Sequence, residues 1–274
     1  MNKIPMILRY HGAKWRIARW IIDKFPEHHS YIEPFFGSGA VFFKKDPAPI
    51  ETINDISGDV VNLFRVVREQ SDNLARAVFA TPYSREEYEQ CCISSSDDPV
   101  ERARIFLVLH WQGFGYRDCT KSGWKRDVNG REAAYAMREW YRLPYSIISV
   151  VDRLKTAQIE CRPALDLIQE YNKPNVLIYC DPPYVMETRR GKQYANEMTD
   201  QDHVRLLKAL NDHKGTVAIS GYDCNLYREM LSGEKWTRYE INALAERGAH
   251  RTEVLWLNTK TKNKDTLQIQ LETK

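Results

Sequence analysis

With 274 residues, of which 43% are hydrophobic and 28% are charged, the chain has a globular composition that excludes a mainly disordered state and can bury one full core with a smaller domain attached. No apolar run approaches the roughly 18 to 20 residues that a membrane-spanning helix needs, so we expect a soluble, cytoplasmic protein that is not exported. The net charge of +3 is too small to demonstrate a polyanionic partner, and the six cysteines, without a Cys-x-x-Cys pair or zinc-ligand spacing, favour reduced thiols over disulfides or a metal site.

The first seventy residues alternate between helices and short strands. Apolar residues at helical spacing predict a helix over residues 17–25, followed by a short strand at 31–33 and a glycine turn. Residues 51–55 predict a second strand, and residues 60–67 predict the helix after it. This order is typical of a parallel sheet whose strands are joined by crossover helices.

The pattern changes between residues 70 and 156, where helices flank a glycine-rich, basic and aromatic loop at 112–126. Residues 102–142 hold nine Lys or Arg against four Asp or Glu, so positive charge is concentrated here. We therefore expect an inserted, mainly helical domain over residues 70–156. The core domain is then discontinuous and consists of residues 1–69 and 157–274.

The α/β alternation resumes after the insertion. Residues 158–161 predict a strand, residues 163–171 a helix, and the apolar run 176–180 a strand that is buried on both faces. Thr199 and Asp202 form a capping signature for the next helix. The last three predicted strands lie at 216–220, 236–241 and 253–258, and we expect the final two to be antiparallel.

The strongest chemical signal is Asp181-Pro182-Pro183-Tyr184, directly after the apolar run. Ligands in an open parallel sheet gather beyond the carboxyl ends of the strands. Two prolines stiffen the segment and remove two amide donors, so the Asp181 carboxylate and the Pro182 carbonyl can accept both N–H bonds of an exocyclic amine. The lone pair of that amine would then face an electrophile, and Tyr184 could stack on the ring. Taken alone, these residues also suit a turn that ends a strand.

The glycine turn between the first predicted strand and the next helix is a second signal. It reads Glu33-Pro34-Phe35-Phe36-Gly37-Ser38-Gly39. Glycines let the backbone approach a ligand closely, but the turn lacks the Gly-Lys-Ser/Thr of a phosphate loop. A nucleotide-like cofactor fits this pattern, and so does a plain turn. Asp55 ends the next strand, where doubly wound folds bind ribose hydroxyls, although it also suits the start of a helix.

Four features occur in one order along the chain. They are Tyr10-x-Gly12-x-Lys14, the segment from Pro34 to Val41, Asn54-Asp55, and Asp181-Pro182-Pro183-Tyr184. Together they resemble the Dam-like class of adenine-N6 DNA methyltransferases, and the resemblance covers residues 8–258. It implies an α/β fold with a Rossmann-like sheet of the S-adenosylmethionine-dependent methyltransferases, into which a mainly helical target-recognition domain is inserted.

The resemblance also implies roles for single residues. Tyr10 and Lys14 would contact the cofactor, although Lys14 on its own would be an ordinary exposed lysine. Asp55 would bind the ribose of S-adenosylmethionine, and Asp181 would face both cofactor and target base. The implied cofactor-binding set is Tyr10, Lys14, Glu33, Pro34, Phe35, Gly37, Ser38, Gly39, Asp55, Asp166 and Asp181, in which Asp166 rests on a loose match, and the implied catalytic set is Asp181, Pro182, Pro183 and Tyr184.

By the same resemblance, the insertion is the target-recognition domain and binds double-stranded DNA. Basic side chains neutralise phosphates, and aromatic side chains can wedge into a base stack. The candidates for these contacts are Arg117, Lys121, Trp124, Lys125 and Arg126. For each basic residue, a role on an ordinary solvated surface stays open. The insertion departs from the sequences of Dam enzymes, so recognition of the DNA sequence GATC is not implied.

The implied reaction moves the sulfonium methyl of S-adenosylmethionine to N6 of a flipped adenine, leaves S-adenosylhomocysteine, and needs no metal. Cytosine N4 is the alternative acceptor, which the resemblance disfavours because Asp rather than Ser occupies position 181. The complete motif at 181–184 disfavours a catalytically silent DNA-binding relative, and the basic insertion disfavours an RNA or protein methyltransferase. The sequence leaves open the DNA site, the oligomeric state and whether a restriction endonuclease is a partner. The resemblance implies a prokaryotic or phage source.

Overall fold

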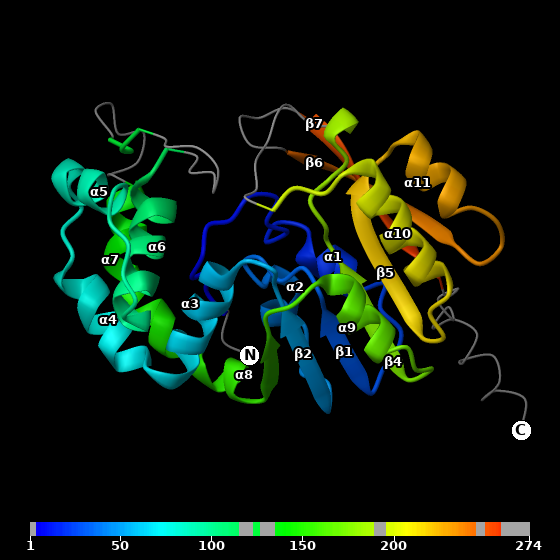
Figure 1. Ribbon diagram of the computed structural model, residues 1–274, viewed down its shortest axis with the longest axis horizontal. Coiled ribbons are helices and arrows are strands. Elements are labelled where there is room, and N and C mark those ends of the chain that lie inside the picture. The colour runs from blue at the N-terminus through cyan, green and yellow to red at the C-terminus, as the bar shows by residue number, and fades with distance from the viewer. Residues whose placement is uncertain (1–3, 115–122, 127–134, 189–195, 245–249, 259–274) are drawn as a thin grey trace, which may run out of the picture.

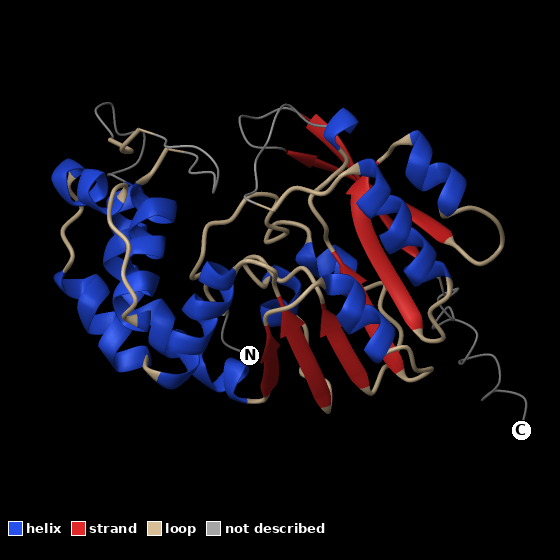
Figure 2. Ribbon diagram, in the orientation of Figure 1, coloured by secondary structure: helices blue, strands red, loops and turns tan. Residues whose placement is uncertain are grey.

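The computed structural model describes residues 4–114, 123–126, 135–188, 196–244 and 250–258. Within them the chain forms two lobes that lie side by side, a sheet covered by helices and a bundle of helices (Figure 1). The strands gather in the first lobe, whereas the second lobe is built from helices (Figure 2). None of the described helices combines the length and the apolar character needed to cross a membrane.

The sheet has seven strands in the order β3-β2-β1-β4-β5-β7-β6. They are β1 (Ser30–Glu33), β2 (Ile50–Asn54), β3 (Ala157–Glu160), β4 (Val176–Cys180), β5 (Thr216–Tyr222), β6 (Thr237–Leu244) and β7 (His250–Leu257). Strands β1 to β5 pair in parallel, while β7 runs antiparallel to both β5 and β6. This arrangement confirms the predicted Rossmann-like parallel sheet and the predicted antiparallel final pair.

The strand order reverses between β1 and β4. From β1 the chain proceeds to β2 on one side, and from β4 it proceeds to β5 on the other. Ligands in open α/β sheets bind beyond the carboxyl ends of the strands at such a point. The glycine turn, which follows β1, and Asp181, which follows β4, are therefore brought to the same crevice.

Helices cover both faces of the sheet. They are α1 (Ala18–Ile22), α2 (Ala40–Lys44), α3 (Gly58–Glu69), α9 (Ala164–Glu170), α10 (Asp200–Asn211) and α11 (Asn225–Met230). Tyr31 and Tyr179 belong to one buried cluster with α1, α2 and α3, whereas Ile32 and Ile178 belong to a second with α9, α10 and α11. Neighbouring residues of a strand thus face opposite clusters, as the pleat requires. Every residue of β4 is buried, which confirms its predicted burial on both faces.

The helical lobe is built around one central helix. Its members are α4 (Ser71–Ala80), α5 (Arg85–Cys91), α6 (Pro99–Gln112), α7 (Tyr135–Ser149) and α8 (Val151–Lys155). Nine of the fourteen residues of α6 are buried, and α3, α4, α5 and α7 pack around it. A single buried cluster runs from Leu177 in the sheet through Phe64 on α3 to Leu107 on α6. The two lobes therefore share one hydrophobic core.

A buried charge cluster joins the return from the helical lobe to the sheet. Arg153, on α8, donates to both carboxylate oxygens of Glu51 on β2 and, over 3.0 Å, to the carbonyl of Phe42. Lys45 Nζ lies 2.6 Å from Glu51 Oε1. Burial alone would raise the pKa of Glu51, but the hydrogen bonds and charges of Arg153 and Lys45 outweigh burial and lower that pKa. Since removing one partner would leave a buried charge uncompensated, this cluster locks α8 against β2.

Candidate active site

A cavity of about 330 Å³ opens at the carboxyl ends of β1 and β4. Its wall is formed by the segment around Tyr10 and Lys14, the glycine turn, Asp55, residues 163–165, and Asp181 with Pro183. Residues 196–198, Asp202 and Leu206 on α10, and Tyr179 on β4 complete the wall. The structure thus brings together six segments from different parts of the sequence.

The glycine turn depends on two residues with left-handed backbone conformation. Gly37 has a φ of 49° and Gly39 a φ of 66°, a region that side chains with a Cβ rarely adopt. A Cβ on Gly39 would also lie 2.4 Å from Cζ of Phe36. The turn therefore requires glycine at position 39 for both conformation and space, and this lets the backbone follow the cavity wall closely.

Asp55 both lines the cavity and holds its backbone. Its Oδ2 accepts from the amide of Gly37 over 2.8 Å, and its Oδ1 accepts from the amide of Ser57 over 2.9 Å. The neighbouring Asn54 donates from Nδ2 to the carbonyls of Pro34 and Arg162, at 2.9 and 3.0 Å. The sequence motif Asn54-Asp55 thus ties together the loops that follow β1, β2 and β3, a role of Asn54 that sequence reasoning did not assign.

Glu33 is a buried acid at the cavity wall. Glu33 is 2% exposed. Its Oε2 accepts from the Tyr31 hydroxyl over 2.8 Å and from the amide of Phe42 over 3.2 Å. Burial raises the pKa of Glu33 to about 8, and the nearby charge of Asp181 adds to this effect. Glu33 is therefore an acid whose protonation changes near neutral pH, in contact with the cavity.

Lys14 is paired with Asp181 inside the protein. Its Nζ lies 3.0 Å from Asp181 Oδ1, donates to the carbonyl of Gly12, and sits 4.7 Å from the centroid of the Tyr184 ring. Burial lowers the pKa of Lys14, but the charges of Asp181 and Glu253 outweigh burial and raise it. At 5% exposure, Lys14 is not an ordinary surface lysine. The interpretation of Lys14 as an ordinary exposed lysine is therefore wrong.

Tyr184 is more enclosed than its expected stacking role suggests. The residue is 9% exposed, and its hydroxyl donates to Oε2 of Glu253 over 2.7 Å. Its ring contacts that of Tyr222 edge to face, with centroids 4.6 Å apart. Tyr222 ends β5, beside the end of β4, and is partly exposed. This second aromatic residue at the site carries no local sequence signal, because strand pairing alone brings it there.

Asp166 and Pro182 stand apart from the cavity. Pro163, Ala164 and Leu165 line it, but Asp166 does not and is exposed. The reason is geometric: α9 begins at Ala164, and each residue of a helix turns by about 100° from the one before. The loose match that placed Asp166 with the cofactor is therefore not supported by its position. Pro182 is buried beside the wall and does not line the cavity.

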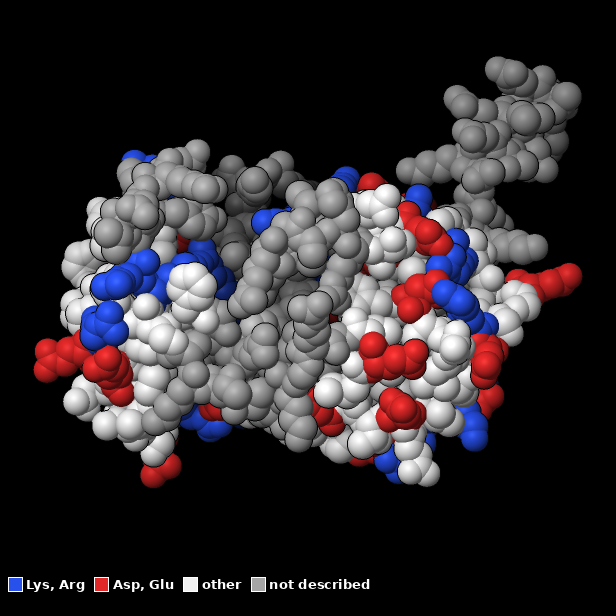
Figure 3. All heavy atoms as spheres, turned by 90° about the horizontal axis from the view of Figure 1, so that it is seen from above, with Lys and Arg blue, Asp and Glu red and all other residues white. Residues whose placement is uncertain are grey.

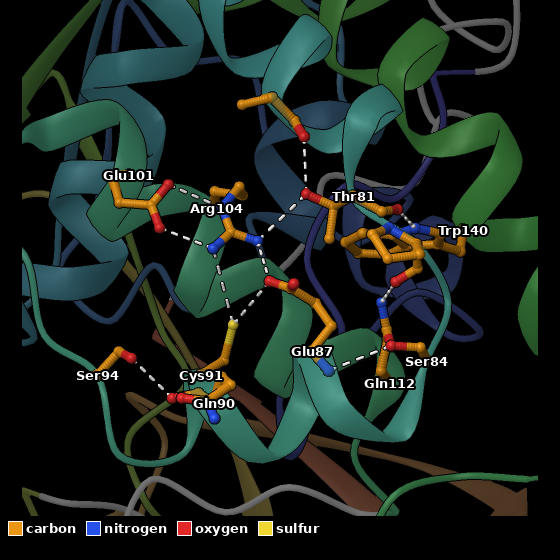
Figure 4. Close-up of polar contacts among 12 residues, drawn as sticks. Thr81, Ser84, Glu87, Gln90, Cys91, Ser94, Glu101, Arg104, Gln112 and Trp140 are labelled. Carbon is orange, nitrogen blue, oxygen red and sulfur yellow. Dashed lines mark hydrogen bonds and ion pairs between the residues drawn. The ribbon is translucent and has the colours of Figure 1, made fainter.

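The corner between α4 and α5 is fixed to the rest of the helical lobe (Figure 4). Trp140 Nε1 donates to the carbonyl of Thr81, and Gln112 Nε2 donates to the carbonyl of Pro82, both over 3.0 Å. Arg104 donates to Oγ1 of Thr81 over 3.2 Å and pairs with two glutamates. The corner is thereby held by α6 and α7 together.

This corner in turn holds Trp124, one of the candidate DNA contacts. The Trp124 ring lies 5.5 Å from that of Tyr83 and 5.2 Å from the guanidinium of Arg85, and its Nε1 donates to Gln112 Oε1 over 3.4 Å. The Tyr83 hydroxyl donates to the carbonyl of Lys125 over 2.7 Å. Trp124 is therefore packed against the bundle, whereas the next residues lead outward.

The other candidate DNA contacts differ in placement. Arg126 is exposed and Lys125 is partly exposed, while Arg117 and Lys121 lie outside the described residues. Seen from above, Lys and Arg side chains form a group on the helical lobe, whereas on the sheet lobe they are interspersed with Asp and Glu side chains (Figure 3). No three His, Cys, Asp or Glu side chains in the part of the chain that the structure describes are arranged to hold a metal ion.

Comparison with known proteins identifies the family of this chain. A family model described as D12 class N6 adenine-specific DNA methyltransferase matches residues 10–244. The DNA adenine methylase of Haemophilus influenzae is 27% identical over 249 residues, covering 85% of each chain. The DNA adenine methylase of Escherichia coli is 25% identical over 279 residues, covering 93% of this chain and 94% of its own. Since the family match spans most of the chain, from the first cavity segment to β6, the protein belongs to the D12 class of N6 adenine-specific DNA methyltransferases.

Proposed function

We propose that the cavity binds S-adenosylmethionine and that residues 181–184 present an adenine of double-stranded DNA for methylation at N6. One observation carries this proposal: Asp181, at the end of β4, lines the same cavity as the glycine turn after β1. This supports the proposal, because the carboxylate of Asp181 borders a cavity whose size is within the range of small-molecule sites, roughly 300 to 1,000 Å³.

The residues of the cavity fit the parts of this cofactor. Asp55 lines the cavity with a carboxylate, a group whose oxygens accept hydrogen bonds from ribose hydroxyls. Phe35 and Leu165 supply apolar surface for the adenine ring. Asp181 supplies a carboxylate for a cofactor that carries a sulfonium and an ammonium charge, and Glu33 adds a second carboxyl group to the same wall.

The motif after β4 then prepares the acceptor nitrogen. When bound, S-adenosylmethionine would supply an electrophilic methyl group, and its transfer to N6 would leave S-adenosylhomocysteine and release one proton of the amine to solvent. Asp181 and the carbonyl of Pro182 accept the two N–H bonds of the amine, which directs the nitrogen lone pair out of the ring. Pro182 and Pro183 have no amide hydrogen to compete for these acceptors.

The target base has to leave the duplex to reach Asp181, at a cost of roughly a few kcal/mol. Tyr184 and Tyr222 form an aromatic corner beside this carboxylate. Stacking of a base on an aromatic side chain contributes about 1–3 kcal/mol, which offsets much of the cost. Because Tyr184 is nearly buried, Tyr222 is the more accessible surface of the pair.

The helical lobe, as the inserted domain of residues 70–156, is proposed to recognise the target. Lys125 and Arg126 would neutralise phosphates, since they follow directly after the packed Trp124 and lead to the surface. In this proposal Trp124 fixes the loop rather than entering the base stack. Arg117 and Lys121 remain candidates in the same loop.

The test measures transfer of tritiated methyl groups from S-adenosylmethionine to unmethylated duplex DNA, followed by digestion to nucleosides and mass spectrometry. We expect N6-methyladenine from the natural protein and at least a 1,000-fold lower rate from Asp181→Ala, about 4 kcal/mol of transition-state stabilisation. Asp97→Ala, at an exposed position in the helical lobe, is the matched control and should keep the natural rate. An N4-methylcytosine product, or an Asp181→Ala variant with unchanged turnover, would refute the proposal.

A further inference from the structure

A chain of hydrogen bonds lies behind the Asp181 carboxylate. Ser220, on β5, is 2% exposed, and its Oγ lies 3.0 Å from Asp181 Oδ1 and 2.9 Å from the Tyr179 hydroxyl. The carbonyl of Cys180 is farther away, at 3.4 Å. Since β4 and β5 are neighbouring parallel strands, the register of the sheet sets Ser220 beside residues 179–181.

The available hydrogens determine which group donates and which accepts in each of these hydrogen bonds. Ser220 carries one hydroxyl hydrogen, and an ionised carboxylate can only accept, so the shorter contact gives that hydrogen to Asp181. Oγ of Ser220 must then accept from Tyr179. Burial and the charge of Asp181 raise the pKa of Tyr179 well above its ordinary value, so the phenol keeps the hydrogen that it donates.

The two oxygens of the Asp181 carboxylate therefore differ. Oδ1 accepts from Ser220 and lies 3.0 Å from Nζ of Lys14. Oδ2 makes no hydrogen bond to any residue that the structure describes. Two donors on the same oxygen restrict rotation of the carboxylate and leave the acceptor capacity of the other oxygen unused.

We infer that Ser220 and Tyr179 are positioning residues, which hold Asp181 by Oδ1 so that Oδ2 accepts a hydrogen of the target amine. This inference rests on the proposed function and assigns the two oxygens of one side chain to different tasks. Ser220 does not line the cavity, and Tyr179, which lines it with only 1% of its surface exposed, meets Asp181 through Ser220. Both residues contribute by orienting the carboxylate, and this orientation affects the rate of methyl transfer once cofactor and base are bound.

The test compares Ser220→Ala, Tyr179→Phe and the double variant in single-turnover methyl transfer with saturating cofactor and duplex DNA. We expect Ser220→Ala to lower the rate about 10- to 100-fold, the size of a hydrogen bond to a charged group, and Tyr179→Phe to lower it about 2- to 10-fold. The dissociation constants for S-adenosylmethionine and DNA should stay within about twofold, because orientation acts on the chemical step. Ser220→Thr, which keeps the hydroxyl, should recover most of the rate.

The double variant distinguishes a hydrogen-bond chain, in which Tyr179 acts through Ser220, from two independent contributions to the rate. If Tyr179 acts through Ser220, then Tyr179→Phe adds no further loss once Ser220 is alanine. Two control variants each remove a hydroxyl group of the same kind at a position away from Asp181. Ser30→Ala removes a buried hydroxyl at the amino end of β1, and Tyr227→Phe removes the hydroxyl that meets His203, so both should transfer methyl groups at the natural rate.

Three results would overturn the inference while leaving the proposed function intact, provided that the natural protein makes N6-methyladenine. They are an unchanged rate in Ser220→Ala, additive losses in the double variant, and a loss of rate that follows weaker cofactor binding or a lower melting temperature. Absence of N6-methyladenine from the natural protein would instead refute the proposed function. The volume-conserving Tyr179→Phe keeps the test decisive if Ser220→Ala folds poorly.

Discussion

The backbone amide of Gly37 donates to Oδ2 of Asp55 over 2.8 Å, which joins the turn after β1 to the end of β2. The amide of Ser57 donates to the other oxygen of the same carboxylate over 2.9 Å. Asp55 therefore shapes the cavity wall in addition to lining it. Loss of this side chain should affect the cofactor both directly and through the backbone.

For Asp55→Ala, we expect the dissociation constant for S-adenosylmethionine to rise about 10- to 100-fold, because acceptors for the ribose hydroxyls and two backbone contacts disappear together. Isothermal titration calorimetry measures this change. The matched control is Asp98→Ala, which removes an Asp that accepts from the amide of Glu101 at the start of α6. The control should lose about 1 kcal/mol of stability and bind the cofactor normally. Equal affinities of the natural protein, Asp55→Ala and Asp98→Ala for S-adenosylmethionine would exclude Asp55 from the cofactor site.

Glu33 predicts a specific pH dependence of stability. Its pKa is about 8 in the folded protein, against an ordinary value of 4.5. Between these values the folded state binds one more proton than the unfolded state, so the free energy of unfolding falls as pH rises, by up to about 1.4 kcal/mol per pH unit. Glu33→Gln removes this titration. Urea unfolding at pH 5.5 and 7.5 should therefore show a smaller pH-dependent loss in the variant, and parallel behaviour of both proteins would contradict the raised pKa.

Gly39→Ala should destabilise the protein by about 3 kcal/mol, because the new Cβ adds a steric clash with Phe36 to the strain of a left-handed residue. Gly233→Ala provides a matched control, since Gly233 has a φ of 83° but no atom would lie within 4 Å of its Cβ. The control should lose only the conformational part, about 1–2 kcal/mol. Thermal unfolding measures both variants. Similar losses would show that space around Gly39 does not matter.

Arg126→Ala should weaken DNA binding more at low salt than at high salt. If this side chain neutralises one phosphate, the slope of log K against log salt concentration becomes shallower by about 0.9. Arg228→Ala is the control, because this exposed arginine pairs with Asp223 on the sheet lobe. Fluorescence anisotropy at several salt concentrations gives both slopes. An unchanged slope in Arg126→Ala would exclude the phosphate contact.

Much of the fold follows from local patterns in the sequence. The apolar run at 176–180 forms β4, and Thr199 and Asp202 form the predicted capping box of α10. The glycine turn and Asp181 meet because parallel strands present their carboxyl ends at one edge. These features depend on a few neighbouring residues and on sheet geometry, which a sequence displays directly.

The surroundings of Asp181 were less accessible to prediction. Ser220 on β5 contacts Asp181 itself, while Tyr222 on β5 and Glu253 on β7 contact the neighbouring Tyr184. Their approach depends on the register between strands far apart in the chain. A serine or glutamate within an apolar strand gives no local signal of such a partner. Trp124 likewise appears in the sequence as one aromatic among basic residues, and only the packing of Tyr83 and Arg85 reveals its fixed position.

The cluster of Arg153, Lys45 and Glu51 limits how the helical lobe can be exchanged between relatives. Arg153 lies on the last helix of the lobe, while Glu51 belongs to the sheet. A chimera that imports a foreign lobe without an arginine at this place would leave the carboxylate with Lys45 alone in an apolar setting. Exchanging the helical lobe therefore requires a graft boundary before α8, so that Arg153 is kept, or a compensating neutral residue at position 51.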